Sequence, residues 1–185
     1  MILLSIILSV NSSFAGSRGG LSYTISGAAV QAPQFVPGVT ATPAVACGGM
    51  GAVVVPEEGG EDSRRRWSLG VLGCLNGVSR YSEFFAGVGG QWGGRHGYLT
   101  ASLLPGLSYY EQYHGGRMYE ALGLTARARG ALGFLVGGMS LEVGPSLSVS
   151  APLITYHTLQ PAEGRFDGMV ALEATFIHGN VGPRR

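Results

Sequence analysis

Much of the chain alternates between apolar and polar residues with a period of two. In residues 97–109 the odd positions are almost all apolar, whereas the even positions include Tyr, Thr and Ser. Residues 166–176 repeat this pattern, with Phe166 and Phe176 at the two ends of the apolar series. Because successive side chains of a β-strand point to opposite faces, the alternation predicts strands with one apolar and one polar face.

Eight strands are predicted between residues 44 and 178, separated by turn signals. Asn76-Gly77, Arg129-Gly130 and Gly144-Pro145 mark turns, since Asn-Gly and Gly- or Pro-containing pairs favour them. Residues 20–30 alternate more weakly. If they also form a strand, either one break is misplaced or the count is ten. The predicted strands are residues 44–55, 66–75, 79–92, 97–109, 118–128, 131–143, 146–157 and 165–178.

The chain divides into four segments by composition. Residues 1–15 are typical of a secretory signal peptide, with an apolar run and small residues before a cleavage site after Ala15. The run is too short to cross a membrane as a helix. Residues 16–43 hold the weak strand and a proline-containing linker, residues 44–178 the predicted barrel, and residues 179–185 a short tail.

Composition narrows the kind of β-protein. Charged residues make up 12% of the chain, about half of the roughly 25% that is typical. The net charge of +1 gives no field that would attract nucleic acid, so we expect no nucleic-acid partner. The 32 glycines lie inside the alternating segments without a collagen period, which indicates close backbone approach and tight turns. The many Lys and Glu side chains of an ordinary solvated sheet face are missing.

These features favour an apolar face that points outward. The polar face carries small side chains and a few charges, which we expect to form a barrel-interior network of Glu83, Arg127, Glu142 and Glu173. Outward aromatics near strand ends are typical of interfacial girdles. The predicted girdle residues are Trp67, Trp92, Tyr109, Phe166 and Phe176. The sequence therefore predicts an all-β fold, a closed antiparallel up-and-down transmembrane β-barrel of about eight strands.

From about Ala44 onward the chain resembles small outer-membrane barrels of the OmpA/OmpX type. In that family the last strand alternates and ends in an aromatic that the barrel assembly machinery reads, and the series ending at Phe176 is similar. Residues 177–185 depart from the pattern. The resemblance implies a place in the cell outer membrane, with lipid and the assembly machinery as partners. Because the chain shows no strong catalytic motif, the leading hypothesis is a structural or surface-interaction role, with loops 56–65 and 158–164 exposed outside as the place where an extracellular ligand would bind.

Cys47 and Cys74 are the only cysteines. If residues 44–55 and 66–75 form a hairpin with Val55 opposite Arg66, Cys47 faces Cys74 directly. Opposed residues of an antiparallel pair are close enough for a disulfide, and an exported chain meets an oxidising compartment. We therefore predict a Cys47–Cys74 disulfide, with two small buried thiols as the alternative.

No motif for catalysis, a cofactor or a metal is recognisable, so we expect no catalytic residues and no cofactor. His96, His114, His157 and His178 fall at strand ends or in loops, as hydrophilic rim residues do. Two alternatives remain. One is a secreted, soluble, lipocalin-like barrel that binds an apolar ligand. The other is a lipid A-modifying acyl hydrolase or transferase, using His157 with a serine and Glu173, or using His96.

Overall fold

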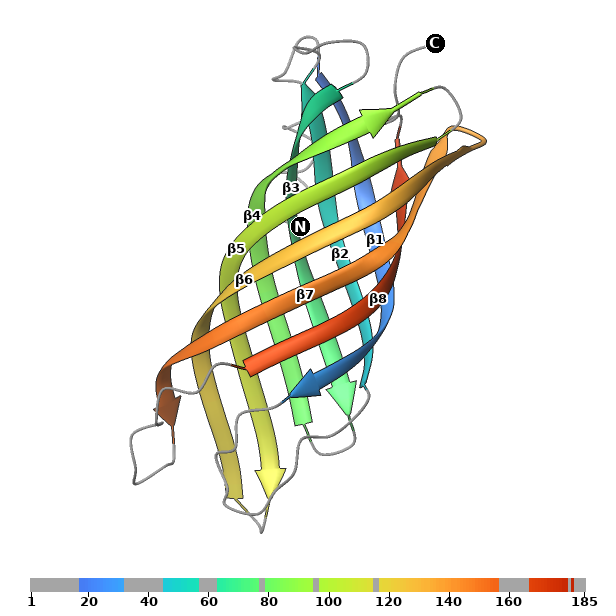
Figure 1. Ribbon diagram of the computed structural model, residues 1–185. Helices are drawn as coiled ribbons and strands as arrows, with labels where there is room; N and C mark the ends of the chain where they lie inside the picture. The colour runs from blue at the N-terminus through green and yellow to red at the C-terminus, as the bar shows by residue number, and fades with distance from the viewer. Residues whose placement is uncertain are drawn as a thin grey trace, which may run out of the picture.

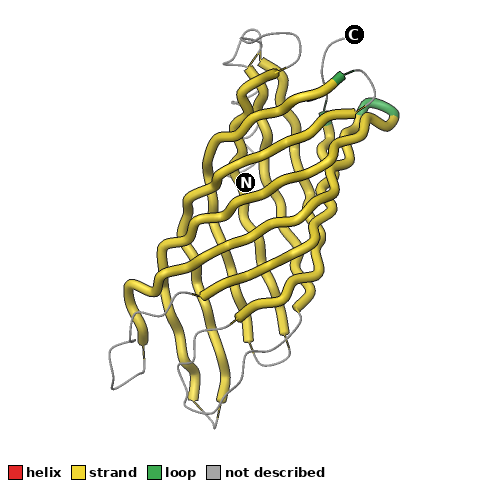
Figure 2. The backbone as a smooth tube through the Cα atoms, in the orientation of Figure 1, coloured by secondary structure: helices red, strands yellow, loops and turns green. Residues whose placement is uncertain are grey.

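The protein is an eight-stranded closed barrel (Figure 1). A computed structural model describes residues 17–31, 45–56, 63–76, 79–94, 97–114, 117–156, 167–179 and 181. Figure 2 shows that nearly all of this part of the chain is extended. The strands are β1 (Ser17–Gln31), β2 (Val45–Pro56), β3 (Ser63–Asn76), β4 (Ser79–Gly93), β5 (Gly97–His114), β6 (Arg117–Val136), β7 (Met139–Tyr156) and β8 (Asp167–His178).

Each strand pairs antiparallel with its neighbours in the chain. The ring closes where β1 pairs with β8, from Leu21 opposite His178 to Gln31 opposite Gly168. The predicted fold class is therefore confirmed. Residues 17–31, which the sequence left as a weak possible strand, belong to the barrel as β1, because β1 pairs with both β2 and β8.

The predicted turns at Arg129-Gly130 and Gly144-Pro145 are wrong. Both pairs lie inside the long strands β6 and β7, and the chain instead turns at Gly137-Gly138. These two glycines have φ values of 57° and 86°, which residues with a Cβ rarely adopt. The strand gained at the N-terminus offsets the one lost here, so the count stays at eight.

The two faces of the barrel wall have opposite character. Outward side chains are apolar and exposed, as with Leu103 at 60% and Leu172 at 64%. Inward side chains are largely serine, threonine, glutamate and arginine, and they are buried. A soluble barrel has the reverse arrangement. Within the described residues, no helix is long and apolar enough to span a membrane.

Connections alternate between the two ends of the barrel. Ser17 and His178 share one end, here called the termini end, where β8 finishes at the top of Figure 1. The opposite end is called the distal end. β2 passes to β3 at the termini end, whereas β7 passes to β8 at the distal end. The strands that flank segments 56–65 and 158–164 therefore meet at opposite ends of the barrel, and the exposure of the two segments outside stays a prediction. Residues 57–62 and 158–164 themselves lie outside the described residues.

Candidate functional site

Six charged side chains meet inside the barrel. Five of them are buried and Arg129 is partly buried, and all six side chains are between 0% and 8% exposed. Three are arginines and three are glutamates, so the cluster carries no net charge. Its members are Arg66 on β3, Glu83 on β4, Arg127 and Arg129 on β6, Glu142 on β7 and Glu173 on β8. We call this set the interior network.

Arg127 connects carboxylates on two opposite walls. Its Nη1 donates to Oε2 of Glu83 at 2.8 Å, and its Nη2 binds Oε1 of Glu173. Glu83 and Glu173 belong to β4 and β8, which lie four strands apart in a ring of eight. The guanidinium also lies over the ring of Phe85, 5.5 Å from its centroid. This side chain therefore spans the barrel interior.

Glu142 anchors a second span. Arg66 binds it through both terminal nitrogens, Nη2 at 3.0 Å from Oε2, and comes from β3 on the opposite wall. Tyr98 Oη donates to Oε1 at 3.0 Å. Arg129 joins the two spans, since its Nη1 donates to Glu142 at 2.8 Å and its Nε to Glu173 at 3.0 Å. Buried charges are tolerated when each has partners of opposite sign, and every member of the interior network does.

The structure brings together all four residues that the sequence assigns to the interior: Glu83, Arg127, Glu142 and Glu173. Sequence reasoning missed Arg66 and Arg129. The turn predicted at Arg129-Gly130 takes Arg129 out of any strand face, and the predicted strand 66–75 begins at Arg66 beside a polar loop. The signal that identifies Arg129 is its spacing of two from Arg127, which puts both on one face once β6 is continuous.

The distal part of the interior holds the predicted disulfide. Cys47 and Cys74 are directly opposed on β2 and β3, with a sulfur–sulfur distance of 2.04 Å. The disulfide prediction and its register are therefore confirmed. Both cysteines belong to a buried apolar cluster, here called the distal cluster, which also contains Leu72, Tyr81, Tyr110, Ala121, Met169 and Ala171.

The termini end of the interior is also apolar. Val53, Val55, Ile177 and Val181 form a buried cluster there. Gln91 Nε2 donates to the carbonyl oxygen of Val181 at 2.8 Å, which holds this part of the tail against β4. The interior network thus lies between two apolar clusters, and side chains occupy the lumen along its length.

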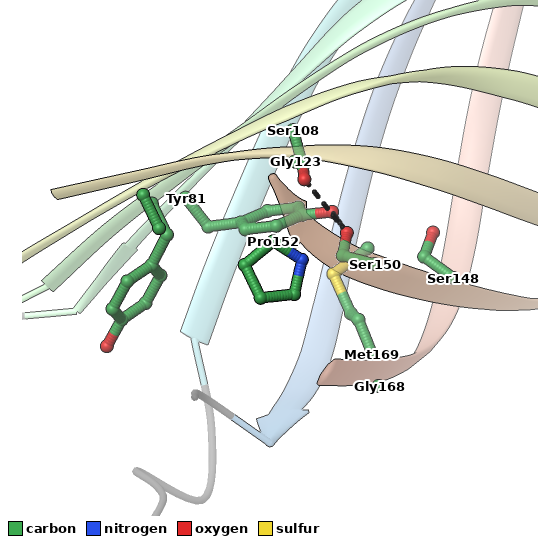
Figure 3. Close-up of a pocket in the computed structure, with 10 residues that line it drawn as sticks. Tyr81, Ser108, Gly123, Ser148, Ser150, Pro152, Gly168 and Met169 are labelled. Atoms are coloured by element: carbon green, nitrogen blue, oxygen red, sulfur yellow. Dashed lines mark hydrogen bonds between the residues drawn. The ribbon is translucent and has the colours of Figure 1, made fainter. Parts of the chain in front are cut away.

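A small cavity opens beside the distal cluster (Figure 3). Its volume is about 20 Å³, and it is lined by Tyr81, Met169, Pro152 and serines of β5 and β7. Ser150 Oγ donates to Ser108 Oγ at 3.0 Å across it. A second cavity of about 40 Å³ adjoins the interior network. Each is large enough for about one or two water molecules. The described part of the lumen therefore offers no chamber for the apolar ligand of a lipocalin-like barrel.

Three of the predicted girdle aromatics are outward and exposed near the termini end: Trp67, Trp92 and Phe176. Tyr109 lies on the outer face towards the distal end, where its hydroxyl donates to Oε1 of Glu120 at 2.6 Å. Phe166 lies outside the described residues.

Little in the described residues favours the lipid A-modifying alternative. Glu173 faces the lumen and binds two arginines, so it does not face the lipid. His96 and His157 lie outside the described residues. Among the residues that are described, no three His, Cys, Asp or Glu side chains converge as metal ligands would.

No known protein family and no curated protein sequence matches the chain. Solved structures of small eight-stranded outer-membrane barrels do match it. Ail, the attachment invasion locus protein of Yersinia pestis, has a TM-score of 0.54 at 10% identity, covering 88% of this chain and 99% of Ail. Neisserial surface protein A has a TM-score of 0.56 at 7% identity, covering 89% of this chain and 97% of that protein. The chain has the outer-membrane barrel fold. At these identities the similarity concerns the fold alone.

Proposed function

We propose that this protein is an integral outer-membrane barrel with a structural or surface-interaction role and a sealed lumen. The observation that carries the proposal is the inverted wall, with an exposed apolar outer face around a buried charged interior. In water, exposure of this much continuous apolar surface is rare, whereas in a bilayer it is required. Outward aromatic side chains lie towards both ends of the barrel wall, as expected where the wall crosses the two membrane–water interfaces.

The strand order supports an orientation. Even-stranded bacterial barrels place short turns on the periplasmic side and longer loops outside. The termini end would therefore face the periplasm, and residues 32–44 and 157–166 would join strands on the outer surface. Under this proposal an extracellular ligand would meet the 158–164 segment, whereas the acidic 56–65 segment would lie on the periplasmic side. The barrel assembly machinery and outer-membrane lipid are the partners that this location requires.

Fractionation tests the location directly. Membranes from cells that express the full chain are washed with high salt and with carbonate, and the pellet is analysed with and without boiling. We expect the protein to stay in the outer-membrane fraction and to change its gel mobility on heating. Release into the soluble fraction would contradict the proposal.

A matched pair of arginine substitutions tests which solvent the outer face meets. Leu103 lies in the middle of β5 and Val136 at the end of β6, and they are almost equally exposed at 60% and 59%. If the wall faces lipid, Leu103→Arg costs about 2–4 kcal/mol of unfolding free energy and Val136→Arg at most about 1 kcal/mol. Urea titration of both variants in lipid vesicles measures the difference. Equal, small effects would indicate that both positions face water.

A further inference from the structure

Both sulfur atoms of the disulfide lie inside the closed barrel. Cys47 is 7% exposed and Cys74 1%. Met169 Sδ lies 3.9 Å from Cys74 Sγ, and Tyr81 belongs to the same cluster. The two cysteines are packed among the other members of this cluster, which are themselves buried. Another molecule therefore cannot reach either sulfur through the described wall of the closed barrel.

Formation of the bond needs such a molecule. Two thiols become a disulfide by losing two electrons and two protons to an oxidant. In thiol–disulfide exchange, one cysteine thiolate attacks a donor disulfide, forms a mixed disulfide and releases one donor thiol. The second cysteine then attacks the mixed disulfide and releases the second donor thiol. The donor must therefore be attached to Cys47 or Cys74 during the reaction, and the closed barrel cannot accommodate it there.

We propose that the Cys47–Cys74 bond forms before the barrel closes, by exchange with an external disulfide donor, so that the β2–β3 hairpin enters barrel assembly already cross-linked. This order of events depends on barrel closure and not on the membrane, so it goes beyond the proposed function.

The composition of β2 explains what the early cross-link contributes. Register is specified by side chains that must face inward, and glycine-rich strands specify it weakly. Gly49 and Gly51 occupy inward positions of β2 opposite Leu72 and Gly70, so two inward positions lack a side chain. A slip of one residue would turn Met50 inward. The bond between the directly opposed Cys47 and Cys74 excludes that slip before β1 and β4 add to the hairpin.

Refolding experiments test the order of events. The reduced full chain is either oxidised in urea with oxidised glutathione and then folded into detergent micelles, or folded first and then given the same glutathione. Free thiols are counted by alkylation after quenching. We expect oxidation of the folded, heat-modifiable barrel to be about 100-fold slower than that of the unfolded chain, because it requires opening of the barrel. Rates within about threefold of each other would overturn the proposal.

A relocated cysteine pair tests whether the detergent micelle, rather than the closed lumen, slows oxidation of the folded protein. Val136 and Met139 are directly opposed beside the β6–β7 turn and are exposed at 59% and 47%. In a C47S/C74S background, the V136C/M139C thiols should react with oxidised glutathione at similar rates in the folded and unfolded states. Slow reaction of this pair in the folded state would overturn the assignment of the wild-type protection to the lumen.

A pulse experiment in cells covers the case in which the reduced chain does not fold. Newly made protein is alkylated at intervals and scored for free thiols and for heat-modifiable mobility. Chains that are already oxidised but not yet heat-modifiable support the proposal. Accumulation of heat-modifiable chains with both thiols free would overturn it.

Discussion

At the scale of single residues, Arg127 joins two opposite walls of the barrel within the interior network. It contacts Glu83 and Glu173 from opposite walls and stacks over Phe85. Arg127→Met keeps much of the length and apolar stem but leaves Glu83 without its arginine and Glu173 with Arg129 alone. Loss of one partner from a buried pair costs about 3–5 kcal/mol, and we expect a fall of this size in the unfolding free energy, measured by urea titration.

Arg65 provides the matched control for that substitution. It is an exposed arginine of β3, next in sequence to the buried Arg66. Since exposed ion pairs contribute little, Arg65→Met should change the unfolding free energy by less than about 1 kcal/mol. Similar effects of the two substitutions would show that the interior network does not stabilise the barrel through paired charges.

At the scale of elements, Gly144 explains why the turn prediction for β7 failed. A Cβ at this position would lie 2.0 Å from the carbonyl oxygen of Gly130 on β6, so the residue permits close strand packing inside a continuous strand. Gly144→Ala should therefore lower the unfolding free energy by about 1–3 kcal/mol, the usual cost of overpacking. Gly27→Ala is the control, because a Cβ at Gly27 meets nothing within 4 Å. Thermal or urea unfolding that ranks the two variants equally would contradict this role.

The alternation of residues was enough to predict the barrel, its apolar outer face and the Cys47–Cys74 register, because each depends on a period of two that survives small errors in strand ends. It could not distinguish glycines that turn the chain from glycines that permit close packing, since both lack a Cβ. The break assumed at Gly130 therefore removed Arg129 from the predicted interior. The pattern of β1 is weak in the sequence because Gly27 interrupts the apolar series of Leu21, Tyr23 and Ile25.

At the scale of the whole molecule, the filled lumen predicts that the barrel does not conduct ions. Arg66 and Glu142 span it from opposite walls, and Val181 lies in the apolar cluster at the termini end. In lipid vesicles loaded with an ion-sensitive dye, the wild-type barrel should leak no faster than protein-free vesicles.

Two variants test whether the apolar cluster at the termini end or the interior network blocks ion passage through the lumen. Val181→Ala loosens the cluster at the termini end but leaves the interior network in place, so leakage should stay at the lipid-only level. The pair R66A/E142A removes one span without changing net charge, and Arg129 keeps its contact with Glu173. We expect this pair alone to raise ion leakage, with heat-modifiable mobility confirming that the barrel is closed. Leakage from the wild-type protein, or from V181A and not from R66A/E142A, would show that the charged spans are not the seal.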